Sequence, residues 1–284
     1  MKTIKIVGVP EHFNFPWQLA IENGNFKKEN IDLQWTNIPE GTGKMCQMLR
    51  NGETDIAVIL TEGIVKDINA GNPSKIVQIY VESPLIWGIH VDAKSEFQSV
   101  LQLKNKKVAI SRLGSGSQLM AFVNAKNQNW NSENLPFEIV NTIDGAVESL
   151  TNGGSDYFMW EKFMTKPLVD KGIFRKIGEC PTPWPCFVIA AREEILKNDF
   201  ETISKILDII NLQTLEFKSI KNIATILADH FNQKTEDIQE WLSLTEWSQN
   251  NLSAETLNKI QNQLFDLKII DKKGTFAEIV YNKL

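Results

Sequence analysis

The stretch that decides the fold is Asp55-Ile-Ala-Val-Ile-Leu60, DIAVIL. An unbroken apolar run of this kind is typical of a strand in a sheet that is covered on both faces. Helical patterns lie on either side of it, at residues 44–51 and from Glu62 to Ala70. The sequence therefore predicts a helix-strand-helix unit with this strand at its centre.

The same alternation extends in both directions from the central strand. Strands are expected at residues 4–9, 31–36 and 74–81, and a helix that starts near Pro16 is expected between the first two. Strand and helix alternate through this first part of the chain, which favours an open and mostly parallel α/β sheet.

A second series of strands and helices begins after Ser83-Pro84. Its expected strands are residues 87–91, 108–111, 137–140 and 156–160, and its expected helices are 118–126, 145–151 and 161–170. The run Cys180-Pro-Thr-Pro-Trp-Pro185 is too rich in proline for a central strand and is expected to connect two domains. A strand at 186–191 follows, and the remainder has helical spacing, so its helices must pack on a domain that is already present.

Composition excludes several classes of protein. The net charge of -5 comes from interspersed residues without a basic block, so nucleic-acid binding is not expected. No apolar run reaches the roughly 18 residues of a membrane span. Cys46, Cys180 and Cys186 form no CxxC pair and the three histidines form no HExxH motif, so neither a metal site nor a cofactor is expected.

Several motifs, taken in order, resemble the type II periplasmic-binding proteins, a family with two α/β lobes and a ligand cleft between the lobes. The chain is similar to the substrate-binding proteins for nitrate, alkanesulfonates and thiamine-pyrimidine precursors. The motifs that carry the resemblance are Phe15-Pro-Trp17, Ala20-Ile-Glu-Asn-Gly24 with Phe26, Gly52-Glu-Thr-Asp-Ile-Ala57, Leu103-Lys-Asn-Lys-Lys-Val-Ala-Ile-Ser111, Gly114-Ser-Gly-Ser117 and Trp160-Glu161.

The resemblance implies a first lobe of residues 1–85 and 189–284 and a second of residues 86–188. It implies a non-catalytic, monomeric protein that closes on a small polar, anionic or heteroaromatic ligand, either with an ABC permease as partner or as an intracellular relative. The alternatives are an enzyme of thiamine-pyrimidine metabolism on the same fold and a sensing domain of a regulator. Because the first residues pass straight into a strand, the expected location is cytoplasmic, or periplasmic or surface-anchored if a signal peptide was removed.

A turn rich in glycine and serine is the first candidate binding element. It follows an expected strand and precedes a helix, where free backbone N–H groups and the helix dipole favour acceptor atoms of a ligand. Leu119 stands where a dinucleotide loop needs its last glycine, so that reading fails. The alternative is a serine-capped turn without a ligand. The candidate contacts are Ser111, Gly114, Ser115, Gly116 and Ser117.

Three further candidates come from the first lobe. Gly41-Thr-Gly-Lys44 lacks the residues of a P-loop, which leaves Thr42 as either a hydroxyl donor to a ligand or a helix cap. Thr61 and Glu62 follow the central strand, at the carboxyl end where open α/β sheets bind ligands. The alternative is that Thr61 only caps the next helix, with Glu62 favouring the dipole of that helix. Ser83 lies at the first crossing between lobes and faces either the cleft or solvent.

Aromatic and carboxylate side chains complete the candidate set. His12, Asn14, Phe15 and Trp17 lie in the ring-rich stretch HFNFPW, which forms either one wall of a cleft or ordinary core. Trp160 and Glu161 resemble a tryptophan-glutamate pair that relatives place near the ligand. A buried Glu161 would need a donor or a cation, which favours an amine or ring N–H on the solute, unless it is only a solvent-exposed helix start. Trp184 either caps the cleft or stiffens the connector.

Overall fold

The computed structural model describes residues 1–132 and 135–282, which form two compact units. The first unit comprises Met1–Ser83 and Trp184–Leu284, and the second comprises Pro84–Pro183. The chain therefore leaves the first unit once and returns to it once. None of the helices in the described ranges has the length and apolar character that a membrane crossing requires.

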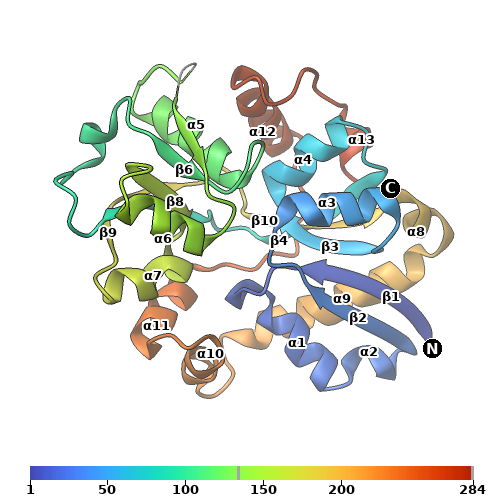
Figure 1. Cartoon of the computed structure of the whole chain (residues 1–284). Helices are drawn as coiled ribbons and strands as arrows, with labels where there is room; N and C mark the ends of the chain where they lie inside the picture. The colour runs from blue at the N-terminus through green and yellow to red at the C-terminus, as the bar shows by residue number, and fades with distance from the viewer. Residues whose placement is uncertain (133–134, 283–284) are drawn as a thin grey trace. The chain divides into compact units, whose positions relative to one another are not determined.

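The first unit contains a sheet of five strands, with helices on both faces. Its elements are β1 (Lys2–Gly8), η1 (His12–Asn14), α1 (Phe15–Glu22), α2 (Asn25–Lys28), β2 (Ile31–Asn37), α3 (Thr42–Asn51), β3 (Ile56–Leu60), α4 (Thr61–Asn69), β4 (Ser74–Val81), β10 (Phe187–Arg192), α8 (Glu193–Asn198), α9 (Phe200–Phe217), α10 (Ile223–Phe231), α11 (Thr235–Leu244), α12 (Ala254–Asp266) and α13 (Phe276–Ile279). Helices α3 and α4 cover one face, and α1, α2 and α9 cover the other (Figure 1).

The sheet of the first unit depends on the returning chain. Its strand order is β2-β1-β3-β10-β4, so β10 lies between β3 and β4. β1 pairs with β2 and β3 in parallel, whereas β10 is antiparallel to both of its neighbours. Strands β3 and β4 do not pair with each other, and residues 187–192 complete the sheet.

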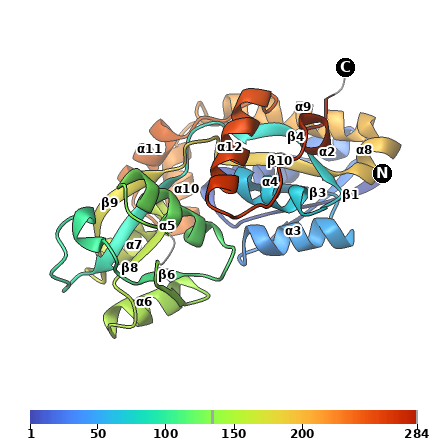
Figure 2. The same ribbon diagram turned by 90° about the horizontal axis from the view of Figure 1, so that it is seen from above.

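The second unit repeats this plan with fewer helices. Its elements are β5 (Ile86–Asp92), η2 (Val100–Leu103), β6 (Val108–Ile110), α5 (Gly116–Asn127), β7 (Phe137–Ile139), α6 (Ile143–Thr151), β8 (Tyr157–Glu161), α7 (Lys162–Asp170) and β9 (Phe174–Pro181). The strand order is β7-β6-β8-β5-β9, and the fourth strand is again the antiparallel one. Helices α5 and α6 lie on opposite faces of this sheet (Figure 2).

The predicted α/β class is confirmed, with two corrections to the strands. Both sheets are mixed rather than purely parallel, because the first strand after each crossing runs against its neighbours. Residues 174–181 form strand β9, which the sequence analysis missed, and Cys180 and Pro181 belong to this strand rather than to a connector. Pro181 is tolerated because β9 pairs only with β5 and lies at the edge of its sheet.

One hydrogen-bonded pair occurs at the same place in both sheets. In the first unit, the Lys5 N–H donates to the Asp55 carboxylate over 2.9 Å and the Asp55 N–H donates to the Lys5 carbonyl over 3.0 Å. In the second unit, Lys107 and Asp156 make the same two bonds over 2.7 and 2.8 Å. Lys5 lies in β1 and Lys107 directly precedes β6, and each is bonded to the residue before the parallel neighbour of that strand. Each pair thereby fixes the start of β3 or of β8.

We expect these two aspartates to be equally important for stability. Asp55→Ala and Asp156→Ala each leave a backbone N–H without its acceptor, which should lower the free energy of unfolding by about 1–3 kcal/mol in urea titrations. The Asn variants, which keep a side-chain oxygen, should recover most of that loss. Asp208→Asn is the matched control, because Asp208 is exposed on α9. Equal stabilities of the alanine and control variants would contradict the importance of the pair.

Candidate functional site

Each sheet has one edge at which its parallel strands end, and polar residues collect there. In the first unit, β3 ends at Leu60, and the antiparallel β10 starts opposite it at Phe187. In the second unit, β8 ends at Glu161, opposite the start of β5 at Trp87. We call these C-terminal ends of the parallel strands, and the residues around them, the first-unit edge and the second-unit edge. The term does not refer to the outermost strands of the sheets. Open α/β sheets bind their ligands at edges of this kind.

At the first-unit edge, Thr61 holds the returning chain. Its hydroxyl donates to the Pro185 carbonyl over 2.6 Å, and its N–H donates to the Cys186 carbonyl over 3.1 Å. Leu60, and not Thr61, occupies the cap position of α4. The expectation that Thr61 caps this helix is therefore wrong, because its hydroxyl is used between segments far apart in the sequence.

Ser83 lies beside the same segment, at the other crossing. Its carbonyl accepts from the Cys186 N–H over 3.3 Å, and its hydroxyl oxygen accepts from the Glu246 N–H over 3.0 Å. Ser83 is half-buried. The segment that leaves the first unit at Ser83 is thus bonded to the segment that returns to it, at Cys186.

Glu62 is a buried carboxyl group next to Thr61. Glu62 is only 2% exposed, and its Oε2 accepts from the Trp184 indole N–H over 2.8 Å. Its Oε1 is buried and has no hydrogen-bond partner among the described residues. Burial raises the pKa of Glu62 from 4.5 to about 7. Trp184 is itself buried and positions Glu62, so the connector contributes directly to this edge.

Thr42, on α3, lies close to α4, the helix that contains Glu62. It is the first residue of α3, whose start has no side-chain cap, and it is half-buried. A side chain at Gly63 would collide with the Thr42 methyl group, so glycine permits the close approach of α3 and α4. The cap alternative for Thr42 is wrong, and its hydroxyl stays a candidate ligand contact.

The aromatic stretch at residues 12–17 lies in the core of the first unit. His12, Asn14 and Trp17 are fully buried, and Phe15 is 6% exposed. The Asn14 amide donates to the Val9 carbonyl over 2.8 Å. Trp17 packs against rings of α2, β2 and β4. These side chains are therefore part of the core of the first unit.

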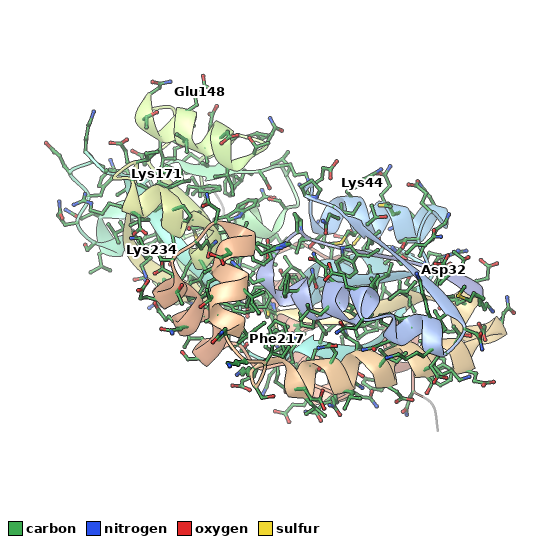
Figure 3. The ribbon with its side chains drawn as sticks, turned by 90° about the horizontal axis from the view of Figure 1, so that it is seen from below. Asp32, Lys44, Glu148, Lys171, Phe217 and Lys234 are labelled. Atoms are coloured by element: carbon green, nitrogen blue, oxygen red, sulfur yellow. The ribbon has the colours of Figure 1, made fainter. Side chains whose placement is uncertain are left out.

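Rings from the C-terminal helices surround this stretch. The His12 ring lies 4.4 Å from Phe231 between ring centroids, and its Nε2 lies 3.1 Å from the Gln233 amide oxygen. Phe217, labelled at the end of α9 in Figure 3, packs its ring 6.3 Å from that of Phe15. Burial lowers the pKa of His12 to about 4. The neutral, enclosed imidazole serves packing rather than proton transfer.

At the second-unit edge, the glycine-serine turn folds into a cluster of hydroxyl groups. The Ser111 N–H donates to Ser117 Oγ over 3.0 Å, and Ser117 Oγ lies 2.9 Å from Ser115 Oγ and 3.4 Å from Ser111 Oγ. Two oxygen-oxygen contacts can use only two of the three hydroxyl hydrogens. One hydroxyl hydrogen is therefore left to donate outside the cluster.

The turn also starts α5 in the predicted way. Ser115 is the N-cap, and its Oγ accepts from the Gln118 N–H over 3.3 Å. Gly114 has a left-handed φ of 73° and donates its N–H to the Gln118 side chain over 2.6 Å. Gly116 is the first residue of the helix. Capping and ligand contact were alternatives in the sequence analysis; the structure shows the cap, together with one spare donor.

Glu161 is the buried carboxyl group of the second-unit edge. It is 4% exposed and caps α7, with its Oε2 accepting from the Met164 N–H over 2.7 Å. Burial raises the pKa of Glu161 from 4.5 to about 7. The solvent-exposed alternative for Glu161 is therefore wrong. Trp160 beside it is half-buried and stacks on Phe158 at 5.3 Å between ring centroids.

Sequence reasoning missed two residues of the second-unit edge. Trp87 is the second residue of β5, and its ring lies 6.2 Å from that of Trp160 between ring centroids. Its buried indole N–H has no partner among the described residues. Arg112 lies inside the serine turn and is half-buried. Its place between Ser111 and Gly114 could have identified it, because an arginine in such a turn suits an anion. For Trp87, only the antiparallel pairing of β5 with β8 reveals the position.

The described residues include no group of three His, Cys, Asp or Glu side chains that could hold a metal ion. The polar groups of the two edges are hydroxyls, indole N–H groups, two neutralisable carboxyls and one arginine. Such groups can bind and orient a small polar molecule.

The buried glutamates make stability depend on pH. Each carboxyl titrates near 4.5 in the unfolded chain and near 7 in the folded protein, so the folded state holds more protons between these values. Stability is therefore lost as the pH rises from 4.5 to 7. For Glu62 the change corresponds to roughly 3 kcal/mol. In urea titrations at pH 5 and pH 8, Glu62→Gln should lose less stability than the wild type over this range.

The variant is compared with wild type because other groups titrate in the opposite direction. Burial lowers the pKa values of His12 and His90 to about 4, so these residues reduce stability as the pH falls below 6.5. Glu148→Gln, at an exposed position of α6, is the charge-matched control. An identical pH dependence for wild type and Glu62→Gln would contradict the raised pKa.

Comparison with known proteins identifies the fold of this chain. Residues 87–180 match the model of a protein family described as Ca3427-like PBP. A structure of the Candida albicans CA3427 gene product, which exhibits the generic periplasmic-binding-protein fold, has 26% sequence identity and a TM-score of 0.89. The alignment covers 96% of this chain and 92% of that one. A search of curated protein sequences found no match.

More distant structures have the same fold over nearly the whole chain. The alkanesulfonate-binding protein SsuA of Xanthomonas axonopodis pv. citri, bound to MOPS, is 14% identical with a TM-score of 0.84, over 99% of this chain and 98% of that one. A ligand-binding component of an ABC-type import system from Staphylococcus aureus, with zinc bound, is 14% identical with a TM-score of 0.76, over 99% and 97%. The chain therefore has the type II periplasmic-binding-protein fold, with its second unit matched to the Ca3427-like proteins.

Proposed function

We propose that this protein is a non-catalytic solute-binding protein that recognises a small polar, anionic or heteroaromatic molecule. The observation that carries the proposal is the presence, at both sheet edges, of buried polar groups with unused hydrogen-bonding capacity. Glu62 Oε1 and the Trp87 indole N–H have no partner among the described residues, and the serine cluster has one hydroxyl hydrogen to spare. Buried polar groups of this kind are costly unless something else satisfies them.

The candidate ligand contacts follow from the geometry of the edges. The first-unit edge supplies Thr42 and Glu62. Trp184 is bonded to Glu62, and Thr61 and Ser83 are bonded to the returning chain at Pro185 and Cys186. The second-unit edge supplies the serine turn, Trp160 and Glu161, to which we add Trp87 and Arg112. The hinge of the domain motion typical of such proteins would lie in residues 81–85 and 185–189.

A role in transport is the finer part of this proposal. The relatives from Xanthomonas and Staphylococcus are components of uptake systems or bind alkanesulfonates, and their fold is the one that this chain has. We propose that the protein acts as a monomer, either by delivering its solute to an ABC permease or as an intracellular binding protein. A permease and an ATPase encoded beside its gene would favour delivery.

One observation favours an enzyme as the second candidate. Both buried glutamates have a pKa of about 7, which suits a general acid or base near neutral pH. An enzyme of thiamine-pyrimidine metabolism would belong to this class. Mass spectrometry of each bound compound after overnight incubation separates the two functions, because a binding protein returns the compound unchanged.

A thermal-shift screen tests the binding proposal. The screen should include sulfonates, nucleobases, vitamins and amino acids, and at least one compound should raise the melting temperature, because a ligand specific for the folded state stabilises it. The increase should grow with the concentration of the compound. The absence of any stabilising compound from all four classes would count against a solute-binding role.

Removal of the hydroxyl cluster should weaken binding of the compound found by that screen. Ser115→Ala together with Ser117→Ala removes the spare donor and should reduce affinity about tenfold, measured by calorimetry. Ser115 is also a helix cap, so the protein should lose roughly 1 kcal/mol of stability. Ser253→Ala, which removes the equivalent cap of α12, is the matched control. Unchanged affinity in the double variant would place the ligand elsewhere.

A further inference from the structure

Glu62 is a carboxyl group of the first-unit edge that keeps one oxygen without a partner among the described residues. One carboxyl oxygen accepts from the Trp184 indole, and the other is buried without a partner among the described residues. A carboxylate oxygen has lone pairs for more than one donor. The unused oxygen therefore calls for a hydrogen-bond donor that the described residues do not provide.

Among the residues that the structure describes, no positive charge shifts the pKa of Glu62. The groups that set its pKa are burial, its own backbone N–H and the Trp184 indole, and no charged side chain of the described residues is among them. Glu161 differs, because it caps a helix and has the Lys162 charge nearby. A buried carboxylate without a counter-charge is unfavourable, so a donor or a cation from outside would be strongly stabilised there.

We propose that Glu62 selects ligands that carry an N–H donor, either an ammonium or amidinium cation or the N–H of a polar ring. This inference rests on the proposed solute-binding function and names its ligand class. The Glu62 carboxylate accepts the N–H of the ligand at Oε1, while Trp184 holds Oε2. A ligand whose polar groups are all acceptors, such as a simple sulfonate, would be repelled by the same carboxylate.

Trp184 is a positioning residue in this proposal. Its indole fixes one carboxyl oxygen and leaves the other free to accept from a ligand. Trp184 also begins the segment in which Pro185 and Cys186 are bonded to Thr61. A ligand donor bound to Glu62 would therefore share that carboxyl group with Trp184, the residue at which the chain returns to the first unit.

Calorimetry with two probes that share one ring tests the proposal. The probes are benzamidine, a cation with N–H donors, and benzenesulfonate, an anion with acceptors only. Neither probe changes its protonation near pH 7. We expect benzamidine to bind the wild type, and to bind Glu62→Gln at least tenfold more weakly. Glu148→Gln, which makes the same charge change at an exposed position, should bind it as the wild type does.

Proton release distinguishes direct contact from a structural effect. At pH 7 about half of the Glu62 carboxyls are protonated, so a bound cation should release up to about half a proton. Titrations in two buffers of different ionisation enthalpy, neither of them a sulfonate, measure this number. Glu62→Gln should abolish the release contributed by Glu62, and Trp184→Phe should shift it while preserving the fold.

Each other outcome decides against the proposal. Benzamidine binding that Glu62→Gln leaves unchanged, or proton uptake instead of release, contradicts it. So does a protein that binds benzenesulfonate and shows no affinity for benzamidine, although the solute-binding function would stand. Binding of other compounds of the screen without binding of either probe also contradicts the proposal that Glu62 selects N–H donors. Failure of the entire screen would contradict the solute-binding function itself.

Discussion

The structure of the first unit depends on the return of the chain as strand β10. This strand lies between β3 and β4, which do not pair with each other, so the sheet is complete only when residues 187–192 are in place. The bonds of Thr61 to Pro185 and Cys186, and of Trp184 to Glu62, surround the point of return. Folding of the first unit and construction of its polar edge therefore use the same contacts.

The two units have the same sheet topology and the same hydrogen-bonded pair at the start of a central strand. Each has three adjacent parallel strands, an antiparallel fourth strand that enters at the polar edge, and a Lys-Asp pair that fixes the start of a central strand. Each also ends that central strand next to a buried glutamate, at Glu62 and at Glu161. The difference lies in how the carboxyl group is satisfied, since Glu161 caps a helix and Glu62 depends on a tryptophan from the connector.

The sequence predicted the fold class and most elements, because apolar runs and helical spacing are local signals. It missed β9, whose alternation is weak and whose end contains proline, and it could not reveal the strand order that places Trp87 opposite Glu161. The ring-rich stretch at His12 was ambiguous, because aromatic residues suit a core and a cleft equally, and the C-terminal helices decided for the core. Which hydroxyls and carboxyls keep spare capacity depends on partners far away in sequence, as Trp184 shows for Glu62.

The most direct test of this account is a crystal structure of the protein with the best compound from the binding screen. The account predicts the compound at the first-unit edge, with an N–H group within hydrogen-bond distance of Glu62 Oε1. A compound bound far from both edges, for example in the hollow of about 440 Å³ lined by Asn69, Lys75 and Glu278, would contradict it.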